Sequence, residues 1–132
     1  MKLITRDTDY AIRALRFILA NKDKTVTSSD IVRELAIPGP FLRKILQRLN
    51  KKGILKSQKG KSGGFLAAKK ADRIFLTDLI EIFQGPLRLN ECFFKKLICP
   101  DLKKCALRKK IKKVESYVTK ELKTITLASL LQ

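Results

Sequence analysis

The stretch PGPFLRKILQRLNKKGILKSQKGKSGGFLAA, residues 38–68, decides the fold. Pro40 suits the first turn of a helix, and Gly53 can end that helix. Between them apolar residues recur at helical spacing, as Leu42, Ile45, Leu46 and Leu49. The pattern predicts a helix from Pro40 to about Lys52, with one buried face and one basic face.

A short hairpin is expected directly after this helix. Residues 54–57 and 65–68 are strand candidates, and the loop between them holds three glycines and two lysines. Because glycine permits the backbone conformations of a tight turn, Lys59 and Lys61 should lie at a thin tip. A basic hairpin in this place is typical of the wing of a winged helix-turn-helix.

The residues before Pro38 predict two further helices. Residues 9–20 carry apolar side chains at helical spacing. The segment Thr27-Ser-Ser-Asp30 matches a capping box and should open a helix that runs through Leu35. A tight turn at residues 38–40 then leads into the basic helix. Two helices joined in this way form a helix-turn-helix.

The residues after the hairpin predict a short helix and a long one. The short helix should run from Leu76 to Gln84, with Thr77 as its N-cap. The long helix should run from about Lys103 to Thr124. Its apolar residues recur at steps of three and four, like the seam of a coiled coil: Leu107, Ile111, Val114, Val118, Leu122 and Ile125. A helix this long beside so small a core is expected to pair with a second copy, so a two-fold homodimer is predicted.

The expected fold class is therefore mainly α with a small β-hairpin wing. It comprises a winged helix-turn-helix and a long C-terminal dimerisation helix. Residues 1–84 should form the DNA-binding domain, residues 85–106 a cysteine-bearing loop, and residues 107–132 the dimerisation helix and tail.

The charge points to a polyanionic partner. Thirty lysines and arginines against 12 acids give a net charge of +18 over 132 residues, and from Phe41 to Phe75 only Asp72 opposes the basic residues. Such a field favours nucleic acid or an acidic membrane surface. No stretch approaches the roughly 20 apolar residues of a spanning helix, and the start lacks the apolar segment of a secretory signal. A cytoplasmic protein that binds double-stranded DNA is expected, with no membrane partner.

Three cysteines are the candidate reactive groups: Cys92, Cys99 and Cys105. An odd number of thiols cannot all pair within one chain, and a reducing cytoplasm should keep them free. Their spacing differs from that of a zinc ribbon and suits a loop around a centre larger than one ion. Spacing alone also leaves open three unrelated cysteines. With no histidine, phosphate loop or suggestive pair of acids, an enzyme is not expected.

Over nearly its whole length the chain resembles the family of winged-helix iron–sulfur transcriptional regulators typified by IscR and NsrR. The resemblance rests on residues 8–15, 41–49 and 60–66, on the three-cysteine loop and on Ile125-Thr-Leu127. It implies that the three cysteines hold an iron–sulfur cluster, of 2Fe–2S or 4Fe–4S type.

The resemblance leaves the fourth ligand open. IscR-like members carry a histidine three residues after the third cysteine, where this chain has Arg108. The NsrR-like pattern uses an aspartate near the N-terminus of the other subunit, and Asp9 occupies the matching position. Asp7 is a less favoured substitute. The alternative role for Asp9 is a helix N-cap.

The resemblance also implies that the start of the third helix and a basic wing residue contact DNA. Arg43 and Lys44 replace an acid and an amide of the IscR-like pattern, so the operator should differ. Both can donate to guanine edges; phosphate contacts or solvated charges are the alternatives. The lysines of the wing should enter the minor groove. The full predicted set is Pro40, Arg43, Lys44, Gln47, Arg48, Lys59 and Lys61, with Pro38 at a corresponding position.

The sequence thus predicts a DNA-binding transcriptional regulator, a repressor, whose operator affinity is controlled by the cluster. The signal would be redox state, nitric oxide or iron–sulfur status. A first alternative is a cluster-free, thiol-sensing winged-helix regulator. A second is a non-specific nucleic-acid-binding scaffold, against which the wing and the dimer seam argue.

Overall fold

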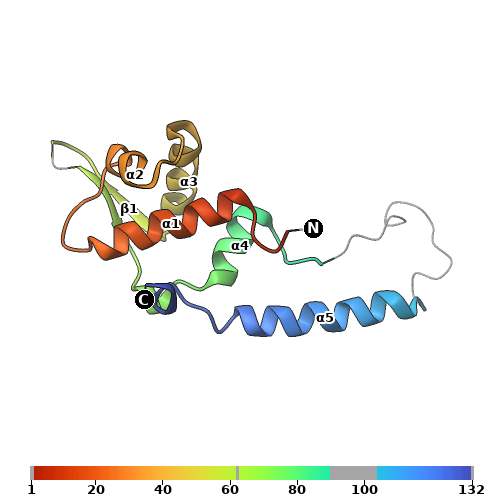
Figure 1. Ribbon diagram of the computed structural model, residues 1–132. Coiled ribbons are helices and arrows are strands. Elements are labelled where there is room, and N and C mark those ends of the chain that lie inside the picture. The colour runs from red at the N-terminus through yellow and green to blue at the C-terminus, as the bar shows by residue number, and fades with distance from the viewer. Residues whose placement is uncertain (1, 62, 90–103, 132) are drawn as a thin grey trace.

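The computed structural model describes residues 2–61, 63–89 and 104–131, which form a mainly helical fold with one β-hairpin (Figure 1). This confirms the predicted fold class. The elements are α1 (Arg6–Ala20), α2 (Ser28–Leu35), α3 (Gly39–Lys51), β1 (Leu55–Gln58), β2 (Gly64–Ala67), α4 (Leu76–Gln84) and α5 (Ala106–Leu122). Short 3-10 turns cover Ala71–Arg73 and Ala128–Leu130.

Helix α1 begins three residues before the predicted start at Asp9. Thr5 is its N-cap, with an Oγ1 atom that accepts a hydrogen bond from the Thr8 N–H. The Asp9 N–H already donates to the Thr5 carbonyl oxygen at 2.9 Å, as in a regular helix. The alternative role of Asp9 as an N-cap is therefore wrong. The first turn is mostly polar, so apolar periodicity gave no signal for it.

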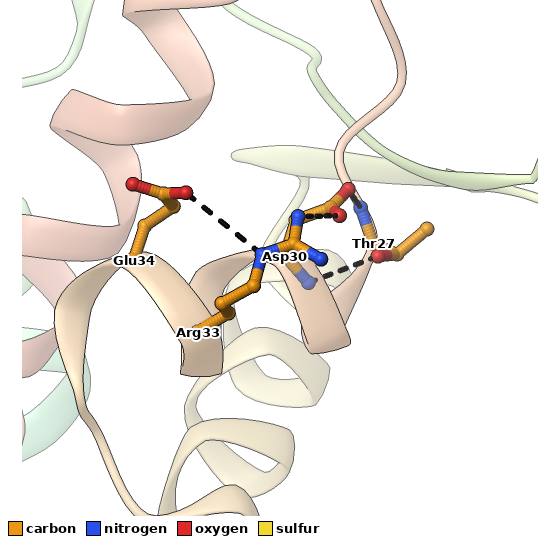
Figure 2. A network of polar contacts seen from close by, with 4 residues as sticks. All are labelled: Thr27, Asp30, Arg33 and Glu34. Atoms are coloured by element: carbon orange, nitrogen blue, oxygen red, sulfur yellow. Dashed lines mark hydrogen bonds and ion pairs between the residues drawn. The ribbon is translucent and has the colours of Figure 1, made fainter.

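The capping box predicted at the start of α2 is confirmed (Figure 2). The Thr27 Oγ1 accepts from the Asp30 N–H at 3.1 Å, and the Thr27 N–H donates to the Asp30 Oδ2 at 3.1 Å. The Arg33 Nη2 lies 3.0 Å from the Asp30 Oδ1, and its Nε lies 3.8 Å from the Glu34 Oε1. The hydrogen bond from the Thr27 backbone is the largest of the effects that lower the pKa of Asp30.

Replacing Thr27 with alanine is expected to lower the free energy of unfolding by about 1 kcal/mol, because the Asp30 N–H loses its acceptor. The pKa of Asp30 is lowered in the folded state. Its carboxylate therefore stabilises the fold above the unfolded-state pKa, and this contribution is lost as the pH falls through the folded-state pKa. Urea denaturation of Thr27→Ala, Asp30→Asn and the control Ser29→Ala across this pH range measures both effects. An Asp30→Asn variant as stable as wild type at pH 7 would contradict the stabilising effect of the Asp30 carboxylate.

The turn between α2 and α3 covers residues 36–38 rather than the predicted residues 38–40, because Gly39 and Pro40 already belong to α3. Gly53 ends α3 as predicted. Its φ is +77°, its N–H donates to the Asn50 carbonyl oxygen, and the Ile54 N–H donates to that of Leu49. This pair of bonds is a Schellman motif, which turns the chain from α3 into the hairpin.

A single large apolar core joins α1, α2, α3, the hairpin and α4. The four apolar residues predicted to face inward from α3 are at most 3% exposed. The C-terminal segment also enters this core. Leu127 is fully buried in it, and its N–H donates to the Ile74 carbonyl oxygen at 2.9 Å. The Leu76 N–H donates to the Ile125 carbonyl oxygen at 3.0 Å, so the residues after α5 are tied to the start of α4.

Both ends of α4 are held by side chains. Thr77 was predicted as its N-cap, which is wrong: Phe75 holds that position, and its N–H donates to the Asp78 Oδ2 at 3.3 Å. At the other end the Gln84 Oε1 accepts from the Thr5 N–H at 3.0 Å and from the Thr8 hydroxyl at 2.6 Å. Gln84 thereby fixes the start of α1 against the end of α4.

Helix α5 lies along α4 with only part of its predicted seam. The predicted start, Lys103, lies outside the described residues, and α5 begins at Ala106. Leu122 and Val118 pack against Leu76 and Ile80 of α4 in a second, smaller apolar cluster. Towards the other end the seam is open: the described residues leave Leu107 66% exposed and Val114 48% exposed. Among the described helices, none is long and apolar enough to cross a membrane.

Candidate nucleic-acid interface

Helix α3 turns a basic face away from the core. Its buried face consists of the four apolar residues already named, and the opposite face exposes all five of the predicted α3 residues: Pro40, Arg43, Lys44, Gln47 and Arg48. Lys51 lies on the same face, because it follows Lys44 by seven positions and Gln47 by four. The predicted set omitted Lys51, although this spacing is readable in the sequence. The side chains of Arg43, Lys44, Gln47 and Arg48 on this face are all exposed, so each can donate hydrogen bonds to a partner.

The start of α3 carries positive potential. Pro38 is its N-cap and makes no side-chain capping bond, and no acid lies in the first turn. A helix N-terminus of this kind attracts phosphate groups. Beside it a hollow of about 420 Å³ separates α2 from α3, lined by Ser28, Ser29, Val32, Arg33, Gly39 and Arg43. Of the two arginines in this lining, Arg33 is already paired with Asp30 and Glu34, so Arg43 and the two serines are the groups that can donate to a phosphate there.

A second hollow, of about 410 Å³, lies between α3, the start of α1 and the end of α4. It is lined by Asp7, Phe41, Lys44, Ile45, Gln47, Arg48, Lys51 and Phe83. The Arg48 guanidinium carbon lies 5.8 Å from the centre of the Phe83 ring. A guanidinium within about 6 Å of a ring centre is attracted to the face of that ring. The structure therefore places Arg48 at the side of α3 that faces α4, and Gln47 lines the same hollow.

The wing is an antiparallel hairpin whose last pair is Gln58 with Gly64. Lys59 and Lys61 are exposed in the loop beyond that pair, as predicted. Val26, which precedes α2, adds a short bridge to Phe65: the Val26 N–H donates to the Phe65 carbonyl oxygen at 3.1 Å, and the Phe65 N–H donates back at 2.7 Å. The hairpin is thereby tied to the residues just before α2.

Gly64→Ala is expected to lower the free energy of unfolding by about 1–3 kcal/mol and to displace the wing. Gly64 has a φ of +154°, and a Cβ there would lie 2.7 Å from the Val26 carbonyl oxygen. Gly60→Ala is the matched control, because Gly60 also has a positive φ but a Cβ there meets nothing within 4 Å. Thermal unfolding of both variants measures the difference. If Gly60→Ala proves the more damaging change, the close approach of residue 64 to the Val26 carbonyl oxygen is not what makes the hairpin sensitive to substitution.

The predicted cluster ligands are only partly within the described residues. Cys92 and Cys99 lie outside them. Cys105 is a free, partly exposed thiol at the N-cap of α5. Asp9 lies on the outer side of α1, 43% exposed, with its Oδ2 2.9 Å from the Arg13 Nε. Within the described ranges no group of three histidine, cysteine or acidic side chains is placed to hold a metal ion.

Comparison with known proteins gives a consistent family. Residues 4–132 match the family model Rrf2, described as an iron-dependent transcriptional regulator. A protein of Aquifex aeolicus described as an HTH-type transcriptional regulator is 32% identical over 124 residues, 92% of this chain and 86% of the relative. Protein aau3 of Rhizobium meliloti is 31% identical over 111 residues, 83% of this chain and 72% of the relative.

Solved structures share the fold. CymR, the global cysteine regulator of B. subtilis, is similar with a TM-score of 0.81 at 20% identity, over 99% of this chain and 97% of that one. For T. potens IscR the TM-score is 0.77 at 22% identity, over 99% and 86%. The oxidized form of Staphylococcus aureus CymR gives 0.78 at 19% identity, over 100% and 97%. At these identities the likeness shows the fold alone.

Proposed function

The chain belongs to the Rrf2 family of transcriptional regulators, and on this premise we propose that it is a homodimeric repressor whose affinity for its operator is set by an iron–sulfur cluster. It is a DNA-binding regulator and not an enzyme. The observation that carries the proposal is the place of Cys105 at the N-cap of α5. A metal ligand at this position would adjoin α5, and the described residues cover only half of the apolar seam of that helix.

The open half of the seam supports the homodimer. Leu107 and Val114 would each be buried against a second copy of α5, which removes their apolar surface from water. A two-fold axis there would present two α3 helices to successive major-groove faces of one operator. In this proposal residues 1–84 bind DNA, residues 85–106 hold the cluster, and residues 107–132 form the dimer helix and a C-terminal segment that packs back into the core of the DNA-binding region through Leu127.

The donor set suits an iron–sulfur cluster. Thiolates of Cys92, Cys99 and Cys105 are the usual protein ligands of such a cluster, which supplies a redox-active and oxidant-sensitive link between them. Asp9 of the second subunit is the proposed fourth ligand. Its exposed ion pair with Arg13 is worth at most about 1 kcal/mol, so the carboxylate can exchange Arg13 for another cation.

The proposed switch acts through geometry. Asp9 lies in α1, whose start is fixed by Gln84 to the end of α4 and which also packs against α3. A carboxylate of α1 held at the other subunit's cysteines would therefore restrain the spacing of the two α3 helices. Loss of that restraint changes operator affinity, because only one spacing fits two half-sites.

Anaerobic purification tests the cluster. We expect brown protein containing iron and acid-labile sulfide, and loss of the colour in each Cys→Ala variant. Asp9→Asn should leave a cluster that decays at least about tenfold faster under nitric oxide or oxygen. Arg13→Gln is the matched control, because it breaks the same ion pair and keeps the carboxylate. Colourless wild-type protein with unchanged operator affinity would overturn the cluster and leave DNA binding intact.

The free, partly exposed thiol of Cys105 also supports a second candidate, a cluster-free thiol switch. A protein of the same fold, CymR, is named a global cysteine regulator and has been solved in an oxidized form. Operator control that survives iron removal but is lost on thiol alkylation would favour this candidate over the cluster.

A further inference from the structure

A stripe of lysines runs along α5 opposite its apolar seam. At about 100° per residue, five exposed lysines fall within roughly 100° of one another around the helix: Lys109, Lys112, Lys113, Lys120 and Lys123. We call these five residues the lysine stripe. The acids of the helix, Glu115 and Glu121, fall outside it, nearer to the seam, and the only other residue within the stripe is Ser116.

The lysine stripe faces away from the DNA-reading helix. Val118 and Leu122 on the seam pack against α4, so the opposite side of α5 points outward. In Figure 1, α5 lies on the far side of α1 and α4 from α3. A duplex lying along α3 and the wing of the same subunit therefore does not reach the stripe. A dimer formed through Leu107 and Val114 leaves the stripe exposed as well, because these residues lie on the other side of the helix.

The composition of the stripe fits a DNA backbone. From Lys109 to Lys123 the helix rises about 21 Å at 1.5 Å per residue, and one strand of a duplex places about six phosphates along that length. Protein interfaces are depleted of lysine and enriched in aromatic residues, whereas phosphate contacts are made largely by lysine and arginine. A helix that lies on a membrane inserts an apolar face beside its lysines, but the C-terminal half of this seam is occupied by α4.

We propose that the lysine stripe binds the phosphate backbone of a second DNA segment, while α3 and the wing hold the operator. Each molecule then bridges two duplexes, or two distant parts of one. The contact is without base specificity and strongly dependent on salt. It requires neither the cluster nor any particular redox state.

A two-duplex capture experiment tests the bridge. A duplex selected in vitro for tight binding is fixed to beads, the full-length protein is added, and a fluorescent 40-bp duplex of random sequence follows. The stripe variant carries Lys109→Gln, Lys113→Gln and Lys120→Gln. The matched control carries Lys22→Gln, Lys24→Gln and Lys70→Gln, which removes the same charge from exposed positions outside α3, the wing loop and α5.

We expect wild type and control to retain the second duplex and the stripe variant to retain at least about tenfold less per bead-bound protein. The salt slope of second-duplex binding should fall by about three in the stripe variant, one for each lysine. Its affinity for the selected duplex and its melting temperature should equal those of the control. Equal retention by the stripe variant and the control would overturn the proposal. So would stripe-dependent capture of anionic vesicles or of poly-glutamate in preference to the duplex.

Discussion

Replacing Arg43 and Lys44 together with alanine is expected to weaken operator binding by at least about a hundredfold. Each side chain is exposed on the outer side of α3, next to its positively polarised start. A contact to a guanine edge is worth about 1–3 kcal/mol, and 1.4 kcal/mol corresponds to a factor of ten in affinity. Since neither side chain is buried, the free energy of unfolding should stay within about 0.5 kcal/mol of wild type. Fluorescence anisotropy with a labelled operator measures the loss.

The double variant Arg16→Ala and Lys22→Ala is the charge-matched control, because both residues are exposed and belong to α1 and the turn after it. This control should lower the affinity for the operator no more than a few-fold. The same titrations on random duplex separate two roles. Replacing a residue that contacts a base should lower affinity mainly for the operator. Replacing a phosphate contact should lower affinity equally for the operator and the random duplex, and should reduce the salt slope by about one. Wild-type affinity in the Arg43 and Lys44 double variant would mean that α3 is not the reading helix.

Leu127→Ala is expected to lower the free energy of unfolding by about 2–5 kcal/mol, the usual cost of removing a fully buried leucine side chain. Leu127 is fully buried in the main core, more than forty residues along the chain from α4. The change leaves a cavity where the C-terminal segment meets Ile74. It should therefore destabilise α1, α3 and the hairpin together with the C-terminal segment.

Leu131→Ala is the control, since Leu131 is 39% exposed and its loss should cost about 0.5 kcal/mol or less. Urea denaturation followed by far-ultraviolet circular dichroism gives both values. If Leu127→Ala proved as harmless as Leu131→Ala, the residues after α5 would not belong to the packed unit that carries α3.

The helix-turn-helix and the wing were predictable because their signals are local. A capping box needs only Thr27 and Asp30, and a Schellman motif needs a glycine at position 53 after an apolar run. Errors arose where local signals were absent or misleading. The first turn of α1 is too polar to show periodicity, and Thr77 has the right chemistry for an N-cap but stands within the helix, where Asp78 caps the backbone instead.

The residues of the candidate interface were predictable from their position opposite an apolar face, but their surroundings were not. The cation–π contact of Arg48 with Phe83 joins residues 35 positions apart, and the hydrogen bonds of Gln84 reach back to Thr5 and Thr8. Neither contact leaves a pattern in one sequence, because a single side chain that meets a distant partner has no period.

By itself the sequence determined the order of helices, the hairpin, the basic outer face of α3 and the apolar seam of α5. Each of these features follows from the spacing of apolar residues within one helix or strand and from its capping residues. Both signals depend on residues within a few positions of each other. Only the tertiary structure decided which half of that seam α4 covers, that Leu127 enters the main core, and that the lysines of α5 face away from α3. These contacts join residues far apart in the sequence. Which of them form depends on how the whole chain packs to bury its apolar surfaces.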